Sequence, residues 1–513
     1  MEGKLMFWQN IPFFCIILSM FSGIFSSILS GKAAKWLNTC VIAAVGIMSA
    51  ILFWFLLQTG ESYTYMMGHF PAPWGNEIRA GVLEAGIALF FSIIMFLSMA
   101  GGRKKLAREV EETKHNLYYI LVNLLLSSLL ALIYTNDLFT AYVFVEINTI
   151  SACGLIMIRQ NGRTIEAAVR YMIMSLLGSG LLLLGICMLY DLTGHLLMSN
   201  IQQAVAVIVA EGTYEIPLLV IIAIMSVGLA IKSALFPFHS WLPDAYGYST
   251  VSSAAILSSL VSKGYIFLLI KIFYRVIGFE VICSSRIINI LYIFGLAAMI
   301  FGSLSAIKEN DIRRMISFSS IAQIGYIYMG IGLGTRGGMI ASIFHILAHA
   351  ATKSLLFISA IGLTDVSEGK RPFTFLTGAG FRHKIAGVGF TVGALSMVGI
   401  PIFSGFVSKL LFAGAALEGG RKMLPALIVL AVSTILNAIY FMKTVIRLYT
   451  PLPLDENNQA EIAGERIQYS YITAAKERGY AITICLFVLV NILLGMSSQP
   501  VVKWIETGLA VFK

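Results

Sequence analysis

Apolar residues occupy most of the chain in runs of about 20, separated by short polar segments. A run of this length, wound as an α-helix, can cross the hydrocarbon core of a bilayer. The pattern predicts about fourteen spans, at residues 11–29, 38–58, 80–100, 117–134, 138–158, 167–190, 216–236, 250–276, 287–306, 313–333, 338–363, 385–415, 423–449 and 480–497. We therefore expect an all-α polytopic membrane protein. The longest polar stretch, residues 451–479, is expected to be a loop before the last span.

Two of these spans contain helix-breaking segments. The seventh runs into Lys232-Ser-Ala-Leu-Phe-Pro-Phe-His-Ser-Trp-Leu-Pro-Asp244, and the twelfth contains Gly399-Ile-Pro-Ile-Phe-Ser-Gly-Phe-Val-Ser-Lys409. Proline removes a backbone donor and clashes with the preceding turn, so both helices are expected to break there. The freed backbone groups must face protein or water rather than lipid. A broken helix in each half points to repeats around a site at mid-membrane depth.

Composition supports the membrane class, because only 12% of the residues are charged and 58% are hydrophobic. Soluble domains carry roughly 25% charged residues. The net charge of +10 does not indicate a nucleic-acid binder, since the basic residues lie in short loops. The six cysteines show no CxxC spacing, so no disulfide framework, iron–sulfur site or zinc site is predicted. The first span lacks a small-residue cleavage site and is expected to be a retained helix.

The basic residues are concentrated in alternate loops. One side of the membrane receives Lys32, Lys35, Arg103, Lys104, Lys105, Arg108, Lys114, Arg159, Arg163, Lys308, Arg313, Arg314, Lys370, Arg371, Arg382, Lys384, Arg466, Lys476 and Arg478. The opposite loops carry few, among them Arg79, Arg336, Arg421 and Lys422. By the positive-inside rule, the basic side is cytoplasmic. Both termini are then expected outside.

Ionisable side chains inside the spans are the candidate functional residues, because each costs several kcal/mol unless it is paired or hydrated. They are Glu146, Lys232, Lys263, His345, His349, Lys353 and Lys409. The residues His345, His349 and Lys353 are spaced i, i+4, i+8 and therefore share one face of the eleventh helix. Burial disfavours a charged lysine and a nearby carboxylate favours it, so separating Glu146 from Lys232 would release a proton. Imidazole both donates and accepts protons near neutral pH. The row therefore predicts a relay in which each site biases the next.

Purely structural interpretations compete with this one. A lysine or arginine near a helix end commonly extends to the interface, which is the preferred interpretation for Arg170, Lys271 and Arg275. The carboxylate of the fifth span could serve only as an ion-pair partner, and the two imidazoles could be packing residues. Beside the first break, His239 and Asp244 could cap freed backbone groups. We keep His239, Asp244 and Lys271 as secondary candidates.

Metal and cofactor sites are not predicted in this chain. His345 and His349 have the spacing of a HExxH helix, but residue 346 is Ile, so the catalytic glutamate is absent. A haem usually takes axial ligands from separate helices, and no second histidine pair is available. The sequence has no Walker A motif and no Rossmann fingerprint in a βαβ context. Any redox or ATP chemistry is therefore assigned to partner proteins.

Four stretches resemble the antiporter-like subunits shared by respiratory complex I, membrane-bound hydrogenases and Mrp-type cation/proton antiporters. They lie at residues 136–146, 232–245, 308–326 and 399–409, and the second and third are the most specific. Residues 65–75 look most like the Mrp D subunit and its hydrogenase relatives. This chain departs from the family pattern at Glu84, where an aspartate is common, and at Ile402, where a second proline is usual.

The resemblance implies a fourteen-helix fold with broken helices 7 and 12 and inverted five-helix repeats. It divides the chain at residues 1–115 (helices 1–3), 116–276 (first repeat), 286–449 (second repeat) and 450–513 (cytoplasmic loop and last helix). The family's hydrophilic axis falls on the seven candidate residues named above. The implied function is proton or cation/proton translocation in a prokaryotic cytoplasmic membrane, with protons or Na⁺ as the transported ions.

The implied partners are other membrane subunits, and the driving reaction is ferredoxin or NADH oxidation elsewhere, or sodium exchange. Two alternatives stay open at this point. A stand-alone secondary transporter would have a polar substrate pocket with few aligned lysines. A redox subunit would hold its own quinone or haem.

Overall fold

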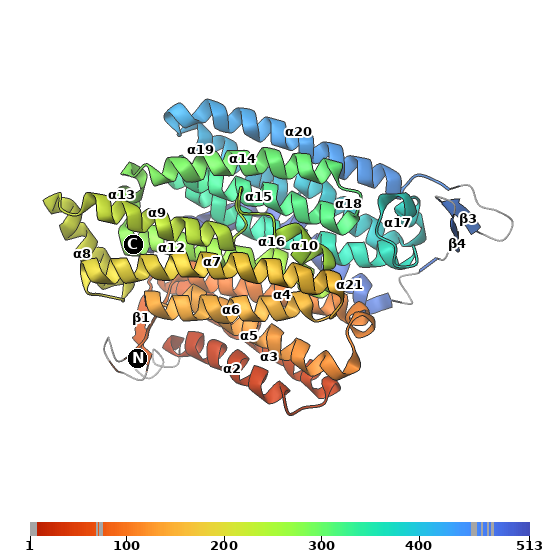
Figure 1. Cartoon of the computed structure of the whole chain (residues 1–513), viewed down its shortest axis with the longest axis horizontal. Helices are drawn as coiled ribbons and strands as arrows, with labels where there is room; N and C mark the ends of the chain where they lie inside the picture. Colours follow the sequence, from red (N-terminus) through yellow and green to blue (C-terminus); the bar gives the residue numbers. More distant parts are fainter. Residues whose placement is uncertain are drawn as a thin grey trace.

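The structure is a computed structural model, and it describes residues 8–67, 70, 75–452, 459–462, 465–468, 471–472 and 477–512. Its long helices lie side by side in one bundle (Figure 1). Among the described residues, twelve helices are long and apolar enough to cross a membrane. The other two predicted spans correspond to the 16-residue helix α2 and to a broken pair, α18 and α19. The predicted polytopic helical fold is confirmed.

The helices of the first half include the predicted spans, together with shorter helices that were not predicted. They are α2 (Ile11–Ser26), α3 (Gly31–Thr59), α4 (Val82–Glu109), η2 (Glu112–Lys114), α5 (His115–Tyr134), α6 (Leu138–Met157), α7 (Gly162–Thr193), α8 (Met198–Glu211), α9 (Glu215–Lys232) and α10 (Leu242–Tyr248). The second half contains α13 (Phe279–Ser284), α14 (Ile287–Lys308), α15 (Ile312–Leu333), α16 (Arg336–Asp365), η5 (Phe373–Leu376), α17 (Ala379–Arg382), α18 (Lys384–Val398), α19 (Ser404–Leu417), η6 (Gly420–Lys422), α20 (Met423–Leu448), α21 (Arg478–Met496) and α22 (Ser498–Val511).

Both predicted breaks are present. Helix α9 ends at Lys232, and the chain turns before α10 begins with a proline in its first turn. Helix α18 ends at Val398, and the next residue, Gly399, has a φ of +91°, a left-handed conformation that favours glycine. A Cβ on Gly399 would also lie 2.8 Å from the side chain of Lys409. The inverted relation of two five-helix repeats, and the four chain divisions built on it, stay predictions.

The eighth span departs from a regular α-helix in a way that was not predicted. It consists of α11 (Val251–Ile256), the π segment η3 (Leu257–Val261), α12 (Ser262–Lys271) and a second π segment, η4 (Ile272–Ile277). The most apolar 18-residue stretch of this span is entirely buried, as is that of α16. These two helices therefore form the centre of the bundle. Short π segments in otherwise α-helical spans are frequent at functional sites.

Several short elements were also missed. Residues 63–80 contain an antiparallel hairpin, β1 (Tyr63–Met66) with β2 (Glu77–Ala80), in which Tyr63 is opposite Ala80. The expected loop at 451–479 contains a second hairpin, β3 (Gln459–Ile462) with β4 (Glu465–Gln468). Part of the 65–75 segment and the basic residue Lys476 lie outside the described residues.

The two ends of the helical bundle differ in charge. Helix α2 begins and α22 ends at the same end of the bundle (Figure 1), which we call the terminal face. The loops that follow α2, α4, α6, α14 and α16 lie at the opposite end, which we call the basic face. Most of the loop lysines and arginines belong to this basic face. The loops therefore alternate between a basic end and a less basic end of the bundle, as predicted from the sequence.

Candidate functional site

Lys232 is the centre of a buried polar group between α5, α6, α9 and α12. Its side chain is 1% exposed, and its Nζ donates to Thr149 Oγ1 at 2.6 Å. The ammonium lies 5.1 Å from the centre of the Tyr265 ring, within range of a cation–π contact. The Tyr265 hydroxyl donates to Asn148 Oδ1 at 2.9 Å, and the Asn148 amide donates to Ser128 Oγ at 2.9 Å. The first break thus ends a helix on a lysine that faces hydroxyl groups.

Glu146 lies one helical turn before Thr149 on α6 and interacts electrostatically with Lys232. These two described residues do not form a direct ion pair, since the ammonium contacts the threonine hydroxyl instead. Glu146 Oε1 is buried and has no hydrogen-bond partner among the described residues. The carboxylate and the amine are therefore close to each other without being locked together.

Lys263 follows the first π segment of the eighth span. Its side chain is fully buried, and its Nζ donates to the backbone carbonyl of Ser258 within that segment. Lys263 also interacts electrostatically with His345, His349 and Lys353 on α16. The two central helices of the bundle thus bring together four of the predicted residues.

The predicted histidine row is present on one face of α16. The rings of His345 and His349 stack at a centroid distance of 5.7 Å and an angle of 13°. His345 Nδ1 lies 2.6 Å from Ser408 Oγ on α19, whereas both ring nitrogens of His349 are buried without a hydrogen-bond partner in the described part of the protein. Within the described part of the chain, no three His, Cys, Asp or Glu side chains are grouped as metal ligands would be.

Two lysines continue the row toward the second break. Lys353 is fully buried, and its Nζ donates to the Ile316 carbonyl at 2.8 Å and to Ser319 Oγ on α15. Lys409 is half-buried on α19, and its Nζ donates to the Val398 carbonyl at 2.6 Å. That carbonyl belongs to the last turn of α18, where backbone acceptors lack partners and the helix dipole favours a cation. The second break therefore supplies the acceptor for Lys409.

Lys271, one of the secondary candidates, lies deeper than predicted. Its side chain is fully buried, and its Nζ donates to the carbonyls of Leu132, Ile133 and Thr135 at 3.2, 2.9 and 2.5 Å. These carbonyls are the unpaired acceptors at the C-terminal end of α5. The expectation that Lys271 extends to the membrane interface is wrong, because its ammonium caps a neighbouring helix inside the protein.

Arg275, one turn further along, belongs to a second buried charged group that was not predicted. Its side chain is 3% exposed, and its Nη1 lies 3.8 Å from Glu84 Oε1, whose side chain is 2% exposed. Its Nη2 donates to Asn136 Oδ1, and the Asn136 amide donates to Glu77. The interface interpretation is therefore wrong for Arg275 as well. An acidic residue early in the apolar helix α4 was the sequence signal for this group.

Residues 135–436 match the protein family described as NADH:quinone oxidoreductase/Mrp antiporter, transmembrane region. The matched region is more than half of the chain. This chain belongs to that family. The family resemblance carried by the four sequence stretches is confirmed.

The relatives of this NADH:quinone oxidoreductase/Mrp antiporter family member extend over most of its length. The NADH-quinone oxidoreductase subunit N of Desulforudis audaxviator is 30% identical over 446 residues, which cover 86% of each chain. A chain of the Mrp complex from Dietzia sp. DQ12-45-1b shares the fold with a TM-score of 0.85 and 23% identity, covering 98% of this chain and 97% of that chain. A chain of an archaeal respiratory membrane complex, the membrane-bound sulfane sulfur reductase, shares the fold with a TM-score of 0.85 and 24% sequence identity, and the match covers 98% of both chains.

The other two secondary candidates, Asp244 and His239, make different kinds of contact in this family member. Asp244 forms ion pairs with Arg170, at 2.9 Å, and with Arg314. The alternative that it caps freed backbone groups is therefore wrong, and its contacts are those of an ion pair near the basic face. His239 stacks on Phe236 at a centroid distance of 5.3 Å and interacts with the backbone of Pro237, within the first break.

Arg170→Gln is expected to change the free energy of unfolding by less than about 1 kcal/mol, because exposed ion pairs contribute little. The Arg170 side chain is 54% exposed, and Arg314 still holds Asp244 when Arg170 is neutral. Thermal unfolding of the purified assembly measures the difference. A large drop in the unfolding midpoint would contradict this peripheral role.

Proposed function

We propose that this chain is the proton- or cation/proton-translocating subunit of a multisubunit membrane complex of the Mrp, hydrogenase or complex I type. One observation carries the proposal: ionisable side chains form a row through the centre of the bundle, from the first helix break to the second. The row consists of Glu146, Lys232, Lys263, His345, His349, Lys353 and Lys409. Ionisable groups at this depth are costly and mark ion pathways.

The hydrogen-bond partners of the four lysines suit proton transfer. Each ammonium donates to a hydroxyl or a backbone carbonyl, and none of the four lysines contacts a carboxylate of the residues that the structure describes. An ammonium held by neutral acceptors can lose its proton without leaving a buried carboxylate unpaired. A proton that arrives at one site disfavours positive charge at the next, so the protonation states are coupled.

The histidines connect the two halves of the row. His349 lies between His345 and Lys353 on α16 and interacts electrostatically with Lys263. Its two ring nitrogens need hydrogen-bond partners, and buried groups of this kind are normally satisfied by ordered water. A neutral imidazole accepts a proton on one nitrogen and donates from the other. We infer that protons pass between Lys263 and Lys353 through this imidazole and water.

The surroundings of the subunit follow from charge and from its relatives. The basic face lies in the cytoplasm, and both termini lie outside a prokaryotic cytoplasmic membrane. The relatives are subunits, so the partners are other membrane subunits, and redox chemistry or sodium exchange in those partners drives transport. The inverted repeats at residues 116–276 and 286–449 would each contribute one broken helix to the pathway. The alternative of a stand-alone solute transporter is not favoured, because the relatives of this chain are subunits of complexes.

Lys263→Ala tests the pathway at its most enclosed point. In everted membrane vesicles that contain the complex, proton translocation is expected to fall several-fold while the complex stays assembled. Lys422→Ala is the matched control, since Lys422 donates to the Gly332 carbonyl near the terminal face and lies off the row. Translocation that is unchanged by Lys263→Ala would count against the proposed function.

A further inference from the structure

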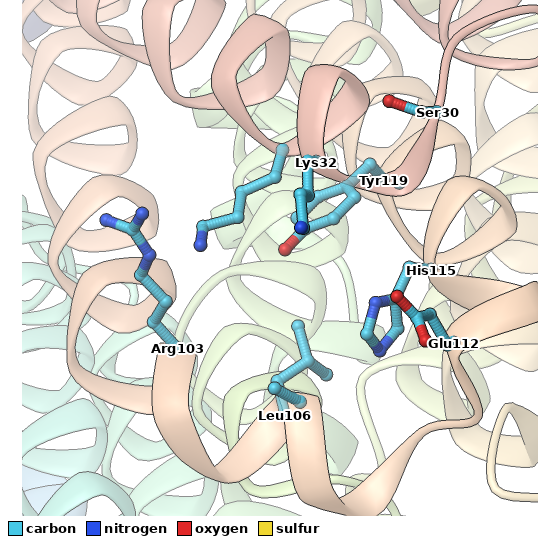
Figure 2. Close-up of a pocket in the computed structure, with 10 residues that line it drawn as sticks. Ser30, Lys32, Arg103, Leu106, Glu112, His115 and Tyr119 are labelled. Carbon is cyan, nitrogen blue, oxygen red and sulfur yellow. The ribbon is translucent and has the colours of Figure 1, made fainter.

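A pocket of about 630 Å³ opens at the basic face, between the start of α3, the end of α4 and the start of α5. It is lined by three cations, Lys32, Lys35 and Arg103, and by one carboxylate, Glu112. Arg103 lies on one side of the pocket, and Glu112 lies beside His115 on the other (Figure 2). The pocket therefore has a net positive lining, and it opens at the end of the apolar helices α3, α4 and α5, where headgroups border a hydrocarbon core.

The pocket cations differ from their neighbours in their partners. On the same end of α4, Lys105 pairs with Asp365, and Lys104 pairs with Glu477 at 3.5 Å. Across the residues that the structure describes, Lys32, Lys35 and Arg103 make no ion pair with a carboxylate; the Arg103 guanidinium lies over the Trp36 ring at 5.5 Å. Uncompensated positive charge is thus confined to the pocket side of α4.

Two further cavities adjoin the pocket along α3. A narrow cavity of about 130 Å³ shares Lys35 and Arg103 with the pocket and reaches Ile42 and Phe96. Those two residues also line a third cavity of about 420 Å³, which runs between α3, α4 and α21 as far as Ala50. Lys35 and Ala50 are about 22 Å apart along α3. One leaflet of the hydrocarbon core is about 15 Å deep, so this length fits a headgroup and one acyl chain.

We propose that these three adjoining cavities together bind one anionic phospholipid of the leaflet at the basic face. The phosphate lies among Lys32, Lys35 and Arg103, and one acyl chain follows the groove between α3, α4 and α21. A free phosphate would leave the groove unused. A helix from another subunit, about 10 Å across, is too wide for the narrow middle cavity. The bound lipid would link the N-terminal helices to α21.

Native mass spectrometry of the purified complex with added lipids tests the headgroup site. We expect phosphatidylglycerol to be retained over phosphatidylcholine with identical chains. The double variant Lys35→Gln/Arg103→Gln should lower phosphatidylglycerol retention about thirtyfold, because each basic group at the membrane surface attracts anionic lipid by about 1 kcal/mol. The control Lys104→Gln/Arg108→Gln removes the same charge from exposed positions on the same helix end and should leave retention unchanged.

Gly46→Leu tests the groove. A Cβ on Gly46 meets Ser92 Cβ at 3.8 Å, an ordinary contact, so the helix pair tolerates the substitution while the added side chain fills the groove. Phosphatidylglycerol retention should fall in this variant too. Full retention in Gly46→Leu would indicate a headgroup-only phosphate site and overturn the proposal. Equal retention of the two lipids by the unsubstituted complex, or cross-linking of another subunit's helix into the groove, would overturn it as well.

Discussion

Proton translocation is expected to fall about a hundredfold when Lys232 is replaced by alanine, because a positioned proton-transferring group contributes at least that much to a rate. The lysine supplies the amine of the polar group formed with Thr149 and Tyr265, and it ends the helix at the first break. Its loss would interrupt the row next to Glu146. Quenching of a pH-sensitive dye in everted vesicles measures the rate, and subunit content of the purified complex measures assembly.

Measuring proton translocation by Glu146→Gln in the same way tests whether Glu146 and Lys232 act together in a relay or have independent structural roles. If the carboxylate acts by biasing the charge of Lys232, the double variant Glu146→Gln/Lys232→Ala should be no slower than Lys232→Ala alone. Glu166→Gln is a suitable control, because this glutamate is exposed on α7 and pairs with the exposed Arg170. Full translocation in both single variants would exclude the row as the pathway. Additive losses would mean that the two residues act separately.

The membrane spans and helix breaks were predictable from sequence, because long apolar runs indicate the spans and prolines indicate the breaks. Hydropathy marks the spans, and the prolines at 237 and 401 mark both breaks, because these residues act through sterics within one helix. Helices α8 and α22 were not predicted, because each has 14 residues, fewer than the about 20 that a membrane-spanning helix needs. The π segments of the eighth span carry no side-chain signature. Strands of four residues are too short to show alternation.

The candidate site was predictable in its residues but not in its contacts. Spacing along one helix places His345, His349 and Lys353 on a common face, so that row follows from sequence. The acceptors of the lysines come from other helices and are ordinary groups, such as the Thr149 hydroxyl and the Val398 carbonyl. Nothing in the sequence distinguishes these acceptors from many others of the same kind.

The interface interpretation failed for Lys271 and Arg275 for a related reason. A position near the end of a span indicates membrane depth, but it does not indicate which element covers that position. Here the C-terminal segment covers it, since the Arg275 guanidinium lies 5.8 Å from the centre of the Phe512 ring. A helix that was not predicted therefore converts a surface position into a buried one. The Glu84 carboxylate at the same depth is the compensating charge.

Glu84→Ala is accordingly expected to destabilise the protein by about 3–5 kcal/mol, because removing one partner leaves the other charge buried without compensation. The guanidinium of Arg275 is 3% exposed and cannot reach water without opening the contacts with α22. Denaturant unfolding of the purified assembly measures the free energy. Glu280→Ala is the control, since this glutamate is exposed on α13 near the same face.

The double variant Glu84→Ala/Arg275→Leu decides whether the loss comes from the unpaired charge or from the cavity left by the glutamate. Replacing a buried ion pair by apolar residues is often neutral, so the double variant should recover most of the lost stability. Recovery would also imply that this second charged group stabilises the end of the bundle without taking part in the proton pathway, and translocation by the double variant should then be nearly normal. A double variant that is folded but inactive would instead place Glu84 and Arg275 on the pathway between Lys263 and the terminal face.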